Sequence, residues 1–231
     1  MKVRSFICLA LLSLAFVPSS LFAQAAEINP YGGFYWPGDN SGVGKFKNNQ
    51  ILGVRGGGYV TPNFEIGGNW AWSNHFTPKS SNEAASLAGA LGFPQGRMRY
   101  NLFEAEFTYA FSKGSLGGSV RPYLVAGGGA LVTTVKDGGE FVLNTRSFTV
   151  TEIDPVTGLP FTRVVFVPND VVDNHDTFFT FSYGGGIKAN RMWGPAGLFA
   201  DIRGRTIPNF FGHGTTWPEL SGGLTFAWGE R

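Results

Sequence analysis

The chain has 231 residues and a formal net charge of +2, of which Lys2 and Arg4 alone supply two positive charges. The rest of the chain is therefore neutral and lacks the basic footprint of a nucleic-acid-binding protein, which excludes nucleic acid as a partner. The single cysteine, Cys8, excludes a disulfide framework and a cysteine metal site. The 34 glycine and 22 phenylalanine residues favour strands and bends, and thus an all-β fold.

Residues 1–25 are predicted to be a secretory signal peptide. Lys2 and Arg4 precede an apolar run from Phe6 to Val17, and small residues follow that run. The apolar run is shorter than the roughly 18 residues that a membrane-spanning helix needs. We expect cleavage after Ala25, with Ala23 as the alternative, and a mature domain of residues 26–231.

Eight segments of the mature domain have strand character, and no later stretch is apolar enough for a spanning helix. They cover residues 27–36, 50–60, 64–73, 98–111, 119–135, 176–190, 196–206 and 217–228. Apolar and polar residues alternate within them; in the fourth segment, for example, Phe103 and Phe107 alternate with Glu104 and Glu106. This period of two predicts strands with one apolar and one polar face.

The period does not decide which face points outward, because a soluble lipocalin-like barrel would place its apolar face inside. Aromatic residues near the predicted strand ends favour an apolar outer surface, since interfacial girdles occur there in membrane barrels. These aromatic residues are Trp70, Trp72, Tyr109, Phe111, Trp193 and Trp228. The fifth segment carries apolar residues on both faces, such as Leu124 and Val125, so its outward face stays open.

The connections between the segments alternate in length. Long connections are predicted at 39–49, 74–97, 136–175 and 208–216, and short ones at 61–63, 112–118 and 190–194. Outer-membrane barrels show this asymmetry, with tight periplasmic turns and longer extracellular loops. Within the longest connection, two strand-like runs flank Asp154–Gly158, which predicts an extracellular hairpin between Phe148 and Val167. Its edge could accept a partner strand, although a self-packed hairpin is the favoured reading.

With these features, residues 26–231 resemble the OmpA/OmpX-like outer-membrane β-barrel family. The start at Asn29–Tyr35 (NPYGGFY) and the end at Gly222–Trp228 (GGLTFAW) are similar to the opening and closing strands of that family. The resemblance implies an eight-stranded antiparallel up-and-down transmembrane β-barrel in the bacterial outer membrane. It also implies outer-membrane lipids and the barrel-assembly machinery as partners. No peptidoglycan-binding domain of the larger OmpA-type proteins is expected.

Charged residues on the polar strand faces form the candidate site. If those faces point inward, their nearly balanced charges can pair across a narrow lumen. We expect this charge ladder to plug the barrel and not to line a conducting path, because about eight strands leave room only for side chains. The predicted ladder consists of Arg55, Glu65, Glu104, Glu106, Lys188, Asp201, Arg203, Arg205 and Glu219.

No catalytic, cofactor-binding or metal-binding residue is predicted. Paired carboxylates such as Glu104 and Glu106 are able to do acid–base chemistry, but alternate positions on one strand face are also the usual layout of a lumen charge ladder. His75, His175 and His213 fall in or beside predicted loops, and their spacing matches no recognisable metal site.

We therefore expect a non-enzymatic outer-membrane protein with an envelope-structural or surface-contact role, whose loops could bind an extracellular ligand. The main alternative is a lipid A-modifying hydrolase or acyltransferase of the PagL or PagP type. The segments Ser73–His75 and His213–Thr215 lack the His-x-Ser pairing and downstream Glu of a PagL-like site. A narrow channel is the third hypothesis.

Overall fold

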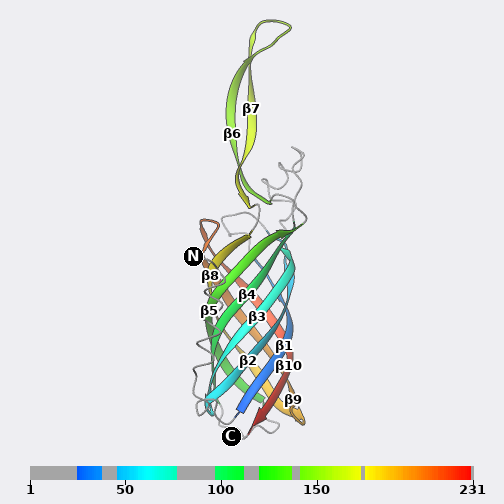
Figure 1. Cartoon of the computed structure of the whole chain (residues 1–231), viewed down its shortest axis with the longest axis vertical. Helices are drawn as coiled ribbons and strands as arrows, with labels where there is room; N and C mark the ends of the chain where they lie inside the picture. Colours follow the sequence, from blue (N-terminus) through cyan, green and yellow to red (C-terminus); the bar gives the residue numbers. More distant parts are fainter. Residues whose placement is uncertain are drawn as a thin grey trace.

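The computed structural model describes residues 25–37, 46–76, 97–111, 120–136, 141–172 and 175–229, which form ten antiparallel strands (Figure 1). The strands of the barrel are β1 (Ala25–Tyr35), β2 (Asn49–Thr61), β3 (Phe64–Phe76), β4 (Arg97–Ala110), β5 (Val120–Lys136), β8 (His175–Trp193), β9 (Ala196–Phe210) and β10 (His213–Gly229). The other two, β6 (Phe141–Ile153) and β7 (Pro160–Val172), form a separate hairpin. Among these residues, no helix is long and apolar enough to cross a membrane.

The eight barrel strands follow an up-and-down order. Each pairs with its neighbours in sequence, except that β5 pairs with β8 across the inserted hairpin and β1 pairs with β10 to close the barrel. The predicted strands and the predicted fold class are confirmed, including the hairpin extension. Closure leaves the barrel without an edge strand, so its backbone groups are paired as a lipid environment requires.

One predicted long connection is wrong. At 208–216 the strands continue, and Phe211 and Gly212 alone join β9 to β10. Both residues have positive φ angles, 48° and 86°, as in the type I′ turn of a tight hairpin. This conformation is strained for an aromatic residue, and the Phe211 ring packs against the ring of Phe178, with the two ring centroids 4.6 Å apart. Pro208 and Gly214 led the sequence analysis to predict a loop here, but both residues lie within strands.

Two other connections are tight turns at the opposite end of the barrel, which we call the turn end. Pro62 and Asn63 join β2 to β3, as predicted, whereas the predicted turn at 190–194 is displaced to Gly194 and Pro195 because β8 continues to Trp193. The predicted signal peptide up to residue 24, loop residues 39–45 and 77–96, and the predicted turn at 112–118 lie outside the described residues.

The outer wall of the barrel is apolar on every strand. Phe107 is 47% exposed, whereas its neighbour Glu106 is 5% exposed and points inward. On β5, the strand left open by the sequence, Leu124 faces outward and Val125 faces inward. Examples of exposed apolar side chains, one per strand, are Ile28, Leu52, Ile66, Phe107, Leu124, Phe179, Ile202 and Leu220. A polar inside and an apolar outside are the reverse of a soluble ligand-binding barrel and define a transmembrane β-barrel.

Most of the predicted girdle residues lie where they were expected. Tyr109 and Phe111 mark the end of β4, and Trp193 and Trp228 mark the ends of β8 and β10, so these four exposed rings gather at the turn end. The prediction is wrong for Trp70, because β3 continues to Phe76 and places this exposed ring in the middle of the strand.

The hairpin β6–β7 rises beyond the end of the barrel where β5 stops and β8 begins, which we call the hairpin end (Figure 1). Its strands pair from Phe141 and Val172 up to Ile153 and Pro160. At the tip, the Asp154 carboxylate accepts hydrogen bonds from the backbone N–H of Val156 (2.8 Å) and of Thr157 (3.4 Å). The bond from Val156, followed by interactions with the side chain and backbone of Thr157, holds the pKa of the Asp154 carboxyl below its ordinary value.

The assignment of faces predicts the cost of a charge on the outer wall. Phe107→Arg places a guanidinium in lipid and should lower the free energy of unfolding by about 2 to 4 kcal/mol, whereas Tyr109→Arg, close to the strand end, should cost about 0 to 1 kcal/mol. Reversible unfolding in lipid vesicles measures both. Equal costs at the two positions would contradict the depth assigned to Phe107.

Candidate functional site

The interior of the barrel is the candidate site, and all nine predicted ladder residues lie in it. Each is at most 7% exposed, because each occupies an inward position of an alternating strand. They come from β2, β3, β4, β8, β9 and β10, so the closed barrel brings together charges from both halves of the chain. They sort into three groups of ion pairs.

The first group is centred on Asp201. Its carboxylate accepts hydrogen bonds from Arg55 at 2.7 Å and from Arg203 at 2.9 Å, and both contacts are salt bridges. Tyr123 also donates to it, at 2.9 Å. Arg203 extends the group to Glu106 at 2.5 Å. A buried carboxylate that accepts several donors in this way avoids the large cost of an unpaired charge.

The second group is centred on Arg205, which is fully buried. Its guanidinium contacts Glu219 at 3.0 Å and Glu104 at 2.5 Å. Asn69 donates to the other oxygen of Glu104, at 3.3 Å. Arg55 lies 3.8 Å from Glu219 and so links this group to the first.

The third group lies nearer the turn end and includes a residue that the sequence analysis missed. Lys188 pairs with Glu27 and, at 3.4 Å, with Glu65. Glu27 also accepts hydrogen bonds from Asn29 and Tyr59, both at 2.7 Å. A signal was present in the sequence, because Glu27 and Asn29 alternate with apolar residues at the start of β1 as the ladder residues do on other strands.

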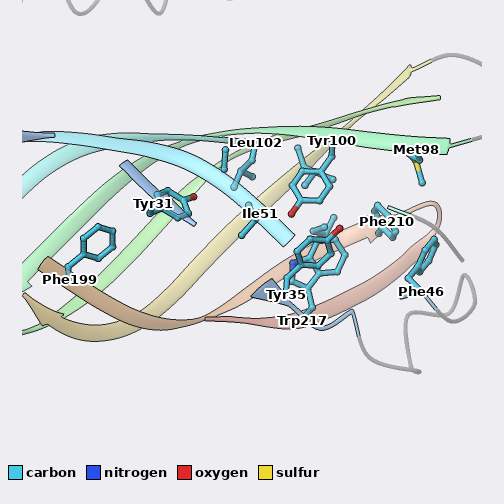
Figure 2. Packing of buried hydrophobic residues seen from close by; sticks show 13 residues of the cluster. Tyr31, Tyr35, Phe46, Ile51, Met98, Tyr100, Leu102, Phe199, Phe210 and Trp217 are labelled. Carbon is cyan, nitrogen blue, oxygen red and sulfur yellow. The ribbon is translucent and has the colours of Figure 1, made fainter. Parts of the chain in front are cut away.

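Toward the hairpin end the interior changes from ionic to aromatic, which the sequence analysis did not predict. Figure 2 shows Tyr35, Tyr100 and Trp217 close together, with Phe210 and Phe46 beyond them. The Tyr35 ring lies 5.5 Å from Tyr100 and 5.9 Å from Trp217, and Phe210 lies 5.8 Å from Trp217. These buried rings fill the lumen above the charges.

Two interior cavities show how little space the side chains leave. One, of about 20 Å³, lies between the Asp201 and Lys188 groups, beside Arg55 and Glu65. The other, of about 10 Å³, lies beside Tyr59 and Arg121. A cavity of roughly 10 to 15 Å³ holds one water molecule. Both are thus of the size of one or two waters.

The remaining candidate residues are spread over the structure. Glu104 and Glu106 pair with different arginines, so they do not form a coupled acid–base pair. His175 begins β8 and His213 begins β10, while His75 lies near the end of β3. Within the described part of the chain, no group of three or more His, Cys, Asp or Glu residues is placed to hold a metal ion.

Comparison with known proteins is informative at the level of structure only. No family model and no curated protein sequence matches the chain. Among solved structures, Neisserial surface protein A is 13% identical, with a TM-score of 0.50, over 87% of this chain and 95% of that one. The N-terminal β-barrel domain of Pseudomonas aeruginosa OprF is 14% identical, with a TM-score of 0.43, over 89% of this chain and 98% of that one.

Attachment invasion locus protein of Yersinia pestis is a third such structure, 11% identical with a TM-score of 0.44 over 89% of this chain and 99% of that one. At these identities the likeness is one of fold. Together with the closed eight-stranded order, the match to Neisserial surface protein A confirms the predicted OmpA/OmpX-like barrel fold. The chain is thus a small transmembrane β-barrel with a packed, charge-paired interior.

The ion pairs predict a specific pattern of stability. Lys188→Met removes the partner of a buried Glu27 and should cost about 3 to 5 kcal/mol of unfolding free energy. The double variant Lys188→Met/Glu27→Gln should cost less than Lys188→Met alone, because the uncompensated charge on Glu27 is gone. Urea unfolding in vesicles measures both.

A matched control is available on the hairpin, where Arg163 and Glu152 form a salt bridge at 2.6 Å with side chains 58% and 38% exposed. Arg163→Met should cost less than about 1 kcal/mol. A cost for Lys188→Met as small as this control would contradict the burial of the Lys188 group.

Proposed function

We propose that this chain is a non-enzymatic protein of the bacterial outer membrane, exported with residues 1–25 as its signal peptide. Its barrel serves as a closed anchor, and the hairpin β6–β7 makes contacts at the cell surface. The observation that carries the proposal is a filled barrel that displays a long hairpin beyond one end (Figure 1). Outer-membrane lipids surround the apolar wall, and the barrel-assembly machinery inserts the chain through its closing strand.

The packed interior favours the closed anchor over the alternative hypothesis of a narrow channel. Three groups of ion pairs cross the lumen, aromatic rings fill it toward the hairpin end, and the two cavities found among the described residues have room for only one or two waters. A conducting path would need these buried side chains to leave their partners, at the cost of unpaired charges in a confined space.

The environment of the serine and carboxylate candidates supports a non-enzymatic role. Ser73 points into the barrel, where its hydroxyl shares a hydrogen bond with the hydroxyl of Tyr35 at 3.2 Å. A lipid A-modifying enzyme needs a nucleophile with an adjacent base and access to lipid. The buried carboxylates Glu104 and Glu106 are neutralised by arginines and are not available as that base.

The surface of the hairpin supports a contact role. A two-stranded hairpin is marginally stable alone in water, yet within the described part of the chain β6 and β7 pair only with each other. Exposed apolar side chains along it include Phe148, Val150, Phe161 and Val164. Apolar groups on an unsupported hairpin are an unfavourable feature in water, and burial against a partner would remove that cost.

A closed anchor predicts the absence of porin-like conductance. Purified protein reconstituted in planar bilayers should show no large steady openings, because the ion pairs and rings occupy the lumen. A large open porin reconstituted in the same bilayers serves as the control for detectability. Stable porin-sized openings of the parent protein would contradict the plug.

The surface-contact role predicts a definite topology. An epitope inserted after Thr157, at the hairpin tip, should bind antibody on unpermeabilised cells. An epitope inserted after Gly114, between β4 and β5, should bind only after permeabilisation, because β4 ends and β5 begins at the turn end. The opposite pattern would show that the hairpin faces the periplasm and would overturn the proposed role.

A further inference from the structure

We propose that the tip of the β6–β7 hairpin inserts its apolar side chains into the surface of a second lipid bilayer, one that faces the membrane holding the barrel. This rests on the proposed function, in which the hairpin lies at the cell surface, and it names the partner of that hairpin. The tip is defined as residues 153–160.

Among the described side chains of the hairpin, the apolar ones of the tip are the most exposed. Val156 is 90% exposed, and Ile153 and Leu159 are 70% and 66% exposed. Pro155 lies between Ile153 and Val156, and Pro160 follows Leu159, so five of the eight tip residues are apolar. Side chains of this kind gain free energy on entering the boundary between headgroups and acyl chains.

The backbone donors of the tip are already bonded, which lowers the cost of leaving water. Asp154 N–H donates to the Leu159 carbonyl at 2.9 Å, and Gly158 N–H donates to the Asp154 carbonyl at 2.8 Å. Val156 and Thr157 N–H donate to the Asp154 carboxylate, and Leu159 N–H donates to the Thr157 hydroxyl at 3.4 Å. The prolines have no N–H. Every backbone donor from Asp154 to Pro160 is therefore bonded within the tip or absent.

This pattern favours lipid over a partner protein strand at the tip. Strand addition depends on free backbone donors and acceptors along an edge, whereas the tip has no free donor to offer. Lipid favours a backbone whose N–H groups are paired internally, as those of the tip are. Its one formal charge, Asp154, accepts two of the hydrogen bonds, and the nearby Glu152 and Arg163 neutralise each other. With no basic cluster, we expect zwitterionic lipid to suffice.

The direction of the hairpin makes the target a second bilayer. Its strands have 13 residues each, which corresponds to roughly 40 Å at about 3.3 Å per residue. The hairpin extends away from the barrel along the long axis of the molecule (Figure 1). The tip is thus held away from the lipids around the barrel wall.

A single fluorescent label tests insertion. In a Cys8→Ser background the chain has no cysteine, so Val156→Cys carries an environment-sensitive dye at the tip and Thr149→Cys carries it on the exposed shaft. The full chain is held in nanodiscs, and phosphatidylcholine vesicles are added. We expect at least about a twofold rise in dye fluorescence at Val156 and no rise at Thr149, because the interface is less polar than water. No rise at Val156, or equal rises at both positions, overturns the proposal.

Flotation of the same nanodiscs with phosphatidylcholine vesicles gives a second readout. Val156→Asp/Leu159→Asp should reduce the floated fraction by about tenfold, since apolar burial drives the binding. The matched variant Thr149→Asp/Thr162→Asp adds the same charge to the exposed shaft and should leave the floated fraction unchanged. If the two double variants behave alike, the tip is not the lipid contact.

Failure of this inference is distinguishable from failure of the proposed function. If antibody reaches the epitope after Thr157 on intact cells but the dye at Val156 does not respond to vesicles, lipid insertion alone is overturned. An epitope that is reached only after permeabilisation overturns the surface role itself, whatever the vesicles show.

Discussion

Closure of the barrel between β1 and β10 is the constraint on which the rest of the structure depends. The two strands pair along their length, from Ala26 opposite Trp228 to Tyr35 opposite Glu219. Backbone groups in lipid need partners within the protein, and a closed sheet supplies them. Once the sheet is closed, the period of two assigns every side chain to the lumen or to the lipid. The lumen of eight strands is narrow, so charges placed there must pair across it.

The lumen is filled so completely because a large side chain can lie directly against the backbone of the barrel wall. Tyr31 on β1 lies opposite Gly53 on β2, and a Cβ atom at Gly53 would come within 2.6 Å of the tyrosine ring. The missing side chain lets the ring lie flat against the wall. The Arg55 guanidinium then sits 4.0 Å from the centre of that ring, so a cation of the Asp201 group also gains a favourable contact with an aromatic face.

Local features of the sequence predicted much of this structure, whereas features that depend on register were not predictable. Alternation within a strand identified the eight barrel strands, and the aromatic residues near the strand ends favoured the outward position of Phe107. The partners in the ion pairs could not be predicted. Arg55 and Asp201, for example, are 146 residues apart, and their contact can be inferred only from the strand order and register. The aromatic filling around Trp217 was missed for the same reason. The turn at Phe211 was missed because it uses an aromatic residue where glycine or asparagine is usual.

The ion pairs also explain how one register is selected. A slip of one residue would turn every side chain of a strand to the opposite face, and on β9 it would carry Asp201, Arg203 and Arg205 into lipid. Each arginine in the middle of a bilayer costs about 2 to 4 kcal/mol, and its former partner would be left unpaired. The hairpin does not disturb this selection, because β5 and β8 stay paired up to Thr134 and His175, directly below the point where it departs. Because the side chains in the lumen fix the strand register, the hairpin is not needed for it. The sequence of the hairpin can therefore be specialised for surface contact.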